Sequence, residues 1–260
     1  EMAWMKKMGV KGIKVDFFGG DKQQTMQLYE DILSDANDYG IQVIFHGCTL
    51  PRGWERMYPN FISSEAVLAS ENVIFTTHHA AQEPFELTMH PFCRNTVASM
   101  DWGGTIMNRY MSRDNKSRHP RQTTDVFEMA AGIMNQAAIQ CIAMCPNNLT
   151  DIPQFEIDWL KQVPTTWDET RFIDGYPGKY AVLARRSGDK WYIVGLNALK
   201  EPLKLTLDLP MFEGKEFTIY SDKPLKKDQK FAEAEMKLGK LNKKGQVKVT
   251  IQPNGGLIIN

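Results

Sequence analysis

Two apolar segments of the sequence contain side chains that can take part in chemistry. Asp16 interrupts an apolar run over residues 12–18, and His46 closes a second run that begins at residue 41. A charged group within an apolar strand is costly to bury unless it has a partner. Lys14 lies on the same face of this strand as Asp16, so the two form either a structural ion pair or part of a catalytic site. His46 is likewise either a hydrogen-bonded core residue or a site residue.

Glu65 and Glu71 are two carboxylates that lie six residues apart, just after the next predicted strand. They are compatible with solvated loop charges, with oxygen ligands for a hard cation such as calcium, or with general acid catalysis. A carboxylate facing Asp16 across a sugar ring would complete the pair that a glycosidase uses. Aromatic side chains in the same region either stack on sugars or pack in the core; they are Trp54, Tyr58, Phe61 and Trp102.

The elements that position these residues alternate between strand and helix patterns up to about residue 165. A strand over residues 12–18, a helix over residues 21–40 and a strand over residues 41–47 predict a parallel βαβ unit. Further strands are predicted over residues 60–64, 92–99 and 140–145, and a further helix over residues 125–138. This pattern predicts either a TIM-type barrel or an open doubly wound sheet. Because the sequence has no GxGxxG or Walker motif, we favour the barrel.

The C-terminal part has a different sequence pattern. Short alternating strands are separated by turn residues, and they cover residues 179–186, 190–197, 203–209, 216–220 and 246–251. The sequence therefore predicts two domains, a barrel portion over residues 1–165 and an antiparallel β-sandwich over residues 166–260. Residues 222–248 contain nine lysines and no arginine, which indicates a solvated surface rather than a nucleic-acid site.

The overall composition excludes several classes of function. The 260 residues include 31 basic and 31 acidic side chains, so the formal net charge is zero. Such a chain has no general attraction to nucleic acid or to anionic membranes. The longest uncharged run, residues 129–150, contains several asparagines and glutamines that are costly in hydrocarbon, so we expect no membrane span.

Five segments, in their order and spacing, resemble glycoside hydrolase family 97. They are GIKVDFF at 12–18, FHGCTLPRGW at 45–54, YPN at 58–60, EAVLASE at 65–71, and PFCRN with MDW within 91–102. The resemblance implies an α/β fold, namely a partial (β/α)8 TIM-type barrel of about strands 4–8, followed by a small antiparallel β-sandwich. In the family's layout Asp16 lies in the fourth barrel strand. The chain is therefore expected to be truncated, without the first three strands and the N-terminal sandwich.

The resemblance also implies a role for each candidate residue. Asp16 lies where the retaining branch has its nucleophile, and Gly47 lies where the inverting branch has a glutamate that activates water. Glu71 matches the general acid/base, and Glu65 with Glu71 matches two calcium-binding carboxylates. Three further residues are expected to bind the sugar or to form a wall of its site; they are Lys14, His46 and Asp101.

The function implied by the resemblance is that of a retaining exo-α-glycosidase, with α-galactosidase the preferred activity and Ca²⁺ the cofactor. The alternatives are an α-glucosidase of the same family and a non-catalytic carbohydrate-binding or assembly fragment. The expected partners are an oligosaccharide with a terminal α-galactose and a second copy of the chain, bound through exposed barrel edges. The family resemblance further implies a periplasmic or secreted bacterial protein.

Overall fold

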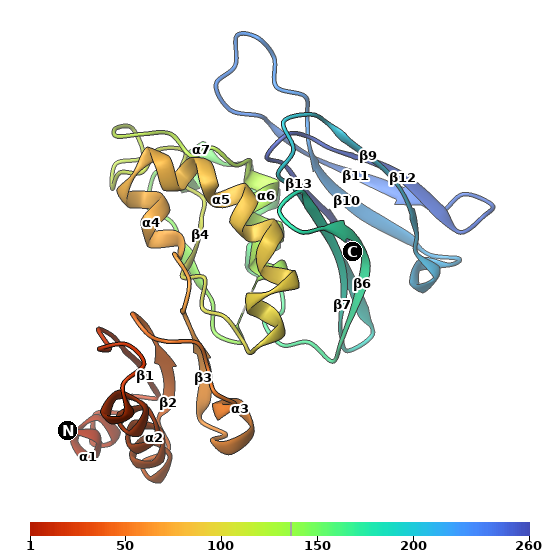
Figure 1. Cartoon of the computed structure of the whole chain (residues 1–260). Coiled ribbons are helices and arrows are strands. Elements are labelled where there is room, and N and C mark those ends of the chain that lie inside the picture. The colour runs from red at the N-terminus through yellow and green to blue at the C-terminus, as the bar shows by residue number, and fades with distance from the viewer. Residues whose placement is uncertain (136) are drawn as a thin grey trace.

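Three apolar cores organise the chain in the computed structural model, which describes residues 1–135 and 137–260 (Figure 1). One core lies in the N-terminal region. A second core fills the space between helix α6 and one face of an antiparallel sheet, and a third covers the opposite face of that sheet. The second core includes Phe127 and Leu196. It is therefore built from residues on both sides of residue 165, near which the strands change from parallel to antiparallel. Among the described residues, no helix is long and apolar enough to cross a membrane.

The N-terminal region is a parallel sheet of three strands in the order β1-β2-β3. Its elements are α1 (Met2–Lys7), β1 (Gly12–Val15), α2 (Gln23–Asp38), β2 (Gln42–Phe45), α3 (Trp54–Met57) and β3 (Phe61–Ser64). Tyr29, Leu33 and Ala36 lie at helical spacing on α2 and bury its inner face. Their aromatic and aliphatic side chains join Phe45 and Trp54 in one core. The predicted βαβ unit is therefore confirmed.

The central region continues the series of parallel strands. Its elements are α4 (Ser70–Phe75), α5 (Thr77–Met89), η1 (His90–Phe92), η2 (Arg94–Thr96), β4 (Gly104–Ile106), α6 (Asp125–Met134), β5 (Cys141–Ala143), α7 (Asn148–Asp151) and α8 (Gln154–Leu160). Strands β4 and β5 pair in parallel, and a parallel bridge joins Ser64 to Met100. Among the described residues, five parallel strands thus follow one another along the chain, three in the sheet β1-β2-β3 and two in the pair β4-β5, which is the strand order expected of part of a (β/α)8 barrel.

Two predicted elements of this region differ from the structure. The strand predicted over residues 92–99 is wrong, because this segment forms the short helices η1 and η2. The guanidinium group of Arg94 is buried here and donates to the backbone carbonyls of Ser64 and Ala98, so the segment folds into turns around it. The predicted helix over residues 125–138 ends at Met134, and residue 136 lies outside the described residues.

The C-terminal region is an antiparallel sandwich. Its strands are β6 (Glu169–Tyr176), β7 (Tyr180–Ser187), β8 (Lys190–Asn197), β9 (Leu203–Asp208), β10 (Glu216–Asp222), β11 (Ala234–Lys240), β12 (Gln246–Ile251) and β13 (Gly256–Ile259), and η3 (Pro210–Phe212) follows β9. Six strands pair in the order β11-β10-β13-β8-β7-β6, and β12 pairs with β9. The predicted sandwich is confirmed, although the sequence did not predict β6, β11 or β13.

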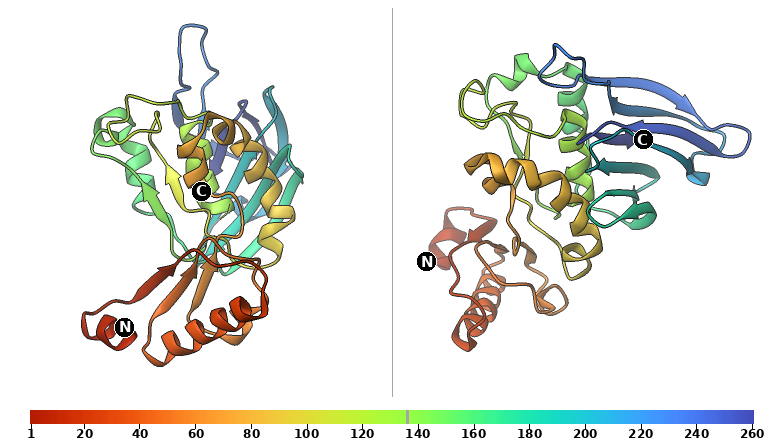
Figure 2. Two further views of the ribbon diagram at one scale, coloured as in Figure 1. Left: turned by 60° about the vertical axis from the view of Figure 1, so that its left-hand side comes forward. Right: turned by 45° about the horizontal axis from the view of Figure 1, so that its top comes forward.

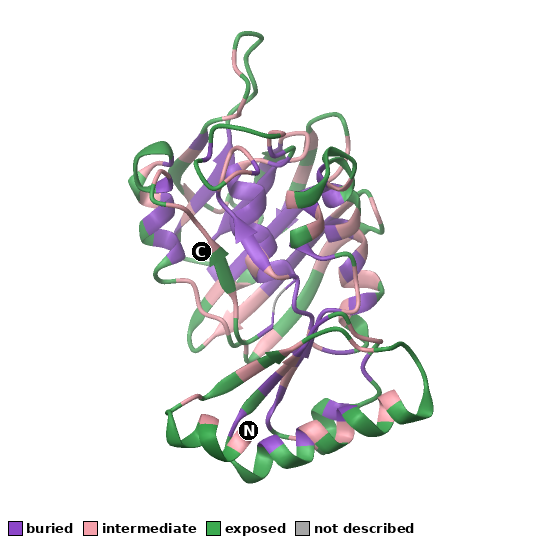
Figure 3. Cartoon of the chain, turned by 90° about the vertical axis from the view of Figure 1, so that its left-hand side faces the viewer, coloured by how far each residue is buried: buried purple, intermediate pink, exposed green. Residues whose placement is uncertain are grey.

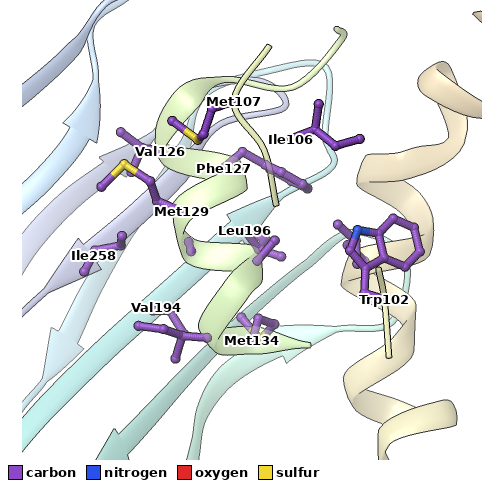
Figure 4. Close-up of a cluster of buried hydrophobic side chains, with 14 of the residues drawn as sticks. Trp102, Ile106, Met107, Val126, Phe127, Met129, Met134, Val194, Leu196 and Ile258 are labelled. Atoms are coloured by element: carbon purple, nitrogen blue, oxygen red, sulfur yellow. The ribbon is translucent and has the colours of Figure 1, made fainter. Parts of the chain in front are cut away.

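Helix α6 joins the two kinds of sheet. It packs on β8 and β13, where Phe127 and Met129 meet Val194, Leu196 and Ile258 (Figure 4). The two views of Figure 2 and the burial colours of Figure 3 show this helix enclosed at the centre of the larger part of the molecule. A Cβ atom at position 256 would lie 2.3 Å from the carbonyl oxygen of Val126. Glycine at this position therefore allows the close approach of β13 to α6.

A buried ionic cluster lies at the N-terminal end of α6. The guanidinium group of Arg121 contacts the carboxylate of Asp125 and donates to the carbonyl oxygen of Ile106 at 2.8 Å. The carboxylate of Glu128 accepts hydrogen bonds from the backbone N–H of Ile106 and from the hydroxyl of Thr123. Burial raises the pKa of Glu128, and burial together with the nearby Glu128 raises the pKa of Glu83 well above its ordinary value.

Candidate active site

The carboxyl ends of the first three parallel strands bring the candidate residues together. Asp16 directly follows β1, His46 and Gly47 follow β2, and Glu65 follows β3. Because neighbouring parallel strands end at the same rim of a barrel, their side chains can converge there. The sequence predicted this rim from the pattern of apolar runs, and the contacts below show how its side chains are arranged.

His46 lies between two carboxylates. Its Nδ1 atom is 3.1 Å from Oδ2 of Asp16, and its Nε2 atom is 3.0 Å from Oε1 of Glu65. The imidazole is 8% exposed, whereas the carboxylate of Asp16 is 38% exposed and so remains open to a substrate. A neutral imidazole carries a single N–H, so both contacts are hydrogen bonds only when a further proton is present on the ring or on one carboxyl. His46 therefore fixes the orientation of both carboxylates.

Glu65 is held by its backbone as well as by its side chain. Its Oε2 atom accepts a hydrogen bond from the backbone N–H of Gly47 at 2.8 Å. Burial raises the pKa of the Glu65 carboxyl, and the Gly47 N–H and His46 oppose this shift, while Glu71 adds to it. The buried Arg94 donates to the carbonyl oxygen of Glu65 at 3.2 Å. Sequence reasoning missed Arg94, although an arginine within the apolar segment PFCRN was a signal for it.

Glu71 lies on the short helix α4 and points to the same cluster. Ligand atoms of His46, Glu65 and Glu71 all lie within 4.8 Å of one another. Calcium takes six to eight oxygen ligands, so the two carboxylates fit this ion and the imidazole nitrogen does not. The carboxylates of Glu65 and Glu71 therefore lie close enough to donate oxygens to one cation, and calcium binding by them stays a prediction.

Lys14 and Asp101 form an ion pair at the edge of this cluster. The Nζ atom of Lys14 is 2.7 Å from Oδ2 of Asp101, and Oδ1 of Asp101 accepts from the N–H of Gly103 at 2.9 Å. The structural pairing of Lys14 with Asp16 considered from the sequence is thus replaced by a pairing with Asp101. This ion pair ties β1 to the segment that leads into β4.

The aromatic residues considered as sugar platforms are mostly core residues. Trp54, Phe61 and Trp102 are buried and belong to the apolar clusters. Tyr58 is partly buried against the N-terminal core. An aromatic side chain that is open to solvent at the site is that of Phe17, which is 94% exposed and directly follows Asp16.

Gly47 leaves the space that the carboxylate of Asp16 occupies. A Cβ atom at position 47 would lie 2.5 Å from Oδ1 of Asp16 and 3.0 Å from the backbone nitrogen of Phe17. The φ angle of Gly47 is +49°, which also disfavours other residues. The N–H of Phe17 donates to Oδ1 of Asp16 at 2.6 Å, with Phe17 itself at a φ angle of +67°. A side chain at position 47 and this placement of Asp16 therefore exclude each other.

Comparison with known families gives matches at both ends of the chain. Residues 1–67 match the family described as Glycoside hydrolase 97, and residues 166–260 match a domain described as Glycosyl-hydrolase 97 C-terminal, oligomerisation. A probable retaining alpha-galactosidase of Streptomyces bingchenggensis (strain BCW-1) is 34% identical over 191 residues. These residues cover 74% of this chain and 28% of that protein.

Solved structures match the whole chain. A beta-arabinopyranosidase is 56% identical with a TM-score of 0.93, over 100% of this chain and 40% of that one. A Glycoside Hydrolase Family 97 enzyme from Pseudoalteromonas sp. strain K8, solved as a variant in complex with panose, is 20% identical with a TM-score of 0.81. That match covers 99% of this chain and 43% of the other, and it shows the shared fold. The chain thus spans less than half the length of each of these proteins.

Proposed function

Because the chain belongs to glycoside hydrolase family 97, we propose that it carries the catalytic pair of a retaining exo-glycosidase, with Asp16 as nucleophile and Glu71 as general acid/base. The observation that carries this proposal is the placement of Asp16. Its carboxylate stands at the end of β1, partly exposed, in the space left free by Gly47. A retaining enzyme needs such an ionised carboxylate beside the anomeric carbon.

The reaction proceeds in two displacements. In the first, an oxygen of Asp16 attacks the anomeric carbon, the bond to the leaving oxygen breaks, and Glu71 donates its proton to that oxygen. In the second, Glu71 takes a proton from water, the water oxygen attacks the anomeric carbon, and the Asp16 carboxylate leaves. His46 keeps the nucleophile oriented through its 3.1 Å contact. Two inversions at one carbon give net retention.

The proposed substrate is a glycan with a terminal α-D-galactosyl or β-L-arabinopyranosyl residue. The relative from Streptomyces bingchenggensis is named for α-galactosidase activity, and the 56% identical structure for β-arabinopyranosidase activity. These two sugars share the ring configuration that faces the catalytic carboxylates and differ in the hydroxymethyl group at C5. A site for one ring therefore recognises the other through the same hydroxyl contacts. Comparing kcat/KM for an aryl α-D-galactoside and an aryl β-L-arabinopyranoside decides whether the site prefers a sugar with or without the hydroxymethyl group at C5.

Covalent labelling tests the nucleophile directly. The intact protein, including any sequence that flanks these 260 residues, is incubated with a 2-deoxy-2-fluoro α-galactosyl fluoride and analysed by intact-protein mass spectrometry. We expect one sugar adduct on the parent and none on Asp16→Ala, because the fluorine at C2 slows both displacements while the fluoride leaving group accelerates only the first. Sugar binding without an adduct or turnover would instead favour the non-catalytic alternative.

Substitution of Gly47 tests the geometry of the site. Gly47→Ala places a methyl group against Oδ1 of Asp16, and displacing a reacting group by about 1 Å costs about 10²-fold. We therefore expect kcat/KM to fall by about 10²-fold. The matched control is Gly53→Ala, because Gly53 also has a positive φ angle but has no atom within 4 Å of the added methyl group. Equal losses in both variants would show that backbone strain, rather than contact with Asp16, causes the effect.

We further propose that Glu65 and Glu71 are calcium ligands. A bound ion stabilises the folded protein by RT ln(1 + [L]/Kd), which is about 2.7 kcal/mol at a hundredfold excess over Kd. We expect calcium to raise the melting temperature of the intact protein, and EDTA to reverse this rise. The rise should be reduced in Glu65→Gln and preserved in Asp158→Asn, which changes an exposed acid on α8. A rise of the same size in Glu65→Gln would show that calcium binds elsewhere.

A further inference from the structure

Helix α4, which carries Glu71, is short and depends on its neighbours for its position. It has six residues, and no side chain caps its N-terminus. An isolated helix of this length is unstable in water. The backbone N–H of Ser70 donates to the carbonyl oxygen of Trp102 at 2.8 Å, and its hydroxyl accepts from the N–H of Gly104 at 2.7 Å. These bonds fix the start of α4 on the segment that enters β4.

The end of α4 is fixed by the loop between β4 and α6, residues 107–124. The Nε2 atom of His119 lies 2.8 Å from the carbonyl oxygen of Val73. The guanidinium group of Arg118 donates to the carbonyl oxygen of Phe75 at 3.4 Å. Carbonyl groups in the last turn of a helix have no partner within the helix. The loop supplies partners for two of them, so it sets the position of the C-terminal end of α4.

This loop is in turn held by the sandwich. The segment between β10 and β11, residues 223–233, projects beyond the sheet (Figure 2). Its Lys230 Nζ atom donates to the hydroxyl of Tyr110 at 3.0 Å and lies 4.6 Å from the centre of that ring. The rings of Phe231 and Tyr110 meet edge to face at 5.5 Å, and Arg109 stacks over Phe231 at 5.6 Å. The two segments therefore meet through polar and aromatic contacts together.

The contacts within the loop connect Tyr110 to α4. Tyr110 forms an antiparallel bridge with Pro120, and the backbone N–H of Met111 donates to the carbonyl oxygen of His119 at 3.0 Å. Tyr110 and His119 therefore belong to one paired turn. A continuous series of contacts leads from Lys230 and Phe231, through this turn, to the helix that carries Glu71.

We propose that Lys230 and Phe231 are positioning residues for Glu71, which act through Tyr110, His119 and helix α4. This inference rests on the proposed role of Glu71 as general acid/base. It gives the sandwich a part in catalysis, since the domain holds the helix of the acid from outside the barrel. Loosening α4 would displace the proton donor while leaving Asp16, on β1, in place.

The expected effect depends on the leaving group. A misplaced acid slows the departure of a leaving group that needs a proton, and it has little effect on one that leaves as a stable anion. We compare phenyl and 2,4-dinitrophenyl α-D-galactosides with the intact protein and its Phe231→Ala and Lys230→Met variants. For the phenyl glycoside kcat/KM should fall by about 10-fold or more. For the dinitrophenyl glycoside it should change by less than about 2-fold, because its departure needs little acid assistance.

Two controls separate positioning from a general structural role. Lys227→Met removes another exposed lysine of the same projecting segment and should leave both rates unchanged. Tyr110→Phe removes the hydroxyl that Lys230 contacts. Adding Lys230→Met to this variant should therefore change kcat/KM for the phenyl glycoside little further. Equal losses for the two substrates, or no loss for either, would overturn the proposal.

A second measurement keeps this proposal separate from the proposed function. Amide hydrogen exchange over residues 70–75 should be faster in Phe231→Ala than in the parent and unchanged in Lys227→Met. If the parent hydrolyses neither glycoside, the proposed function fails, and the exchange rates of α4 then test the contact series alone. Unchanged exchange in Phe231→Ala would overturn it.

Discussion

Replacing Asp16 with asparagine is expected to lower kcat/KM by on the order of 10⁴-fold or more, because the amide cannot act as the nucleophile that forms the glycosyl-enzyme. Asparagine has nearly the same shape as aspartate, and its one oxygen can accept from the N–H of Phe17 while its NH2 group donates to Nδ1 of His46. The fold should therefore survive. The measurement is kcat/KM for an aryl α-galactoside, with the melting temperature recorded on the same samples.

The smaller Asp16→Gly variant gives a positive test of the same role. It vacates space next to Gly47, so a small anion such as azide can enter and attack the anomeric carbon directly. We expect azide to restore turnover of an activated substrate and to give a glycosyl azide with inverted configuration. Inversion follows because only one displacement remains. A product of retained configuration would mean that another residue is the nucleophile.

Asp21→Asn is the matched control for the loss of a carboxylate near β1. Asp21 is exposed and pairs with Arg52 at 2.9 Å. An exposed pair of this kind contributes about 0–1 kcal/mol to stability. We expect its activity to stay within about 2-fold of the parent. If Asp21→Asn lost as much activity as Asp16→Asn, the loss in both variants would be due to the change in surface charge rather than to a missing nucleophile.

The position of the candidate site at the ends of the parallel strands could be predicted from the sequence, whereas the partners of its side chains could not. Apolar runs that end in Asp16 and His46 show where parallel strands end, and this pattern is local. The partner of Lys14 is Asp101, 87 positions further along the chain, and strand alternation indicates a face but not the group that meets it. The contacts of His46 with Asp16 and Glu65 could not be predicted for the same reason, since the three residues follow three different strands.

Strand prediction failed where burial did not alternate along the sequence. Strand β6 is an edge strand with mostly exposed or half-buried residues, and β11 lies within a lysine-rich stretch that the sequence indicates as solvated surface. Edge strands often carry such charged residues, which weakens their apolar pattern. The segment around Arg94 failed for the opposite reason. It contains a buried guanidinium that donates to backbone carbonyls, so it forms turns instead of a strand.

Replacing Arg121 with methionine should lower the free energy of unfolding by about 3–5 kcal/mol, because it leaves buried carboxylates without their positive partner. The side chains of Arg121 and Asp125 are 1% and 3% exposed, and Glu83 and Glu128 lie in the same buried cluster. The measurement is urea unfolding of the intact protein. Arg171→Met is the control, since Arg171 pairs with Glu169 at the surface and should contribute about 1 kcal/mol or less.

The pH dependence of this loss separates uncompensated charge from lost packing. Burial raises the pKa of Glu83 and Glu128, so the folded state binds protons more tightly than the unfolded state. Removing Arg121 raises these pKa values further, and the added penalty grows as the pH rises above the ordinary glutamate value. The difference in stability between Arg121→Met and the parent should therefore be smaller at pH 5 than at pH 8. Equal differences at both pH values would mean that the missing side-chain contacts, rather than the buried charges, destabilise the variant.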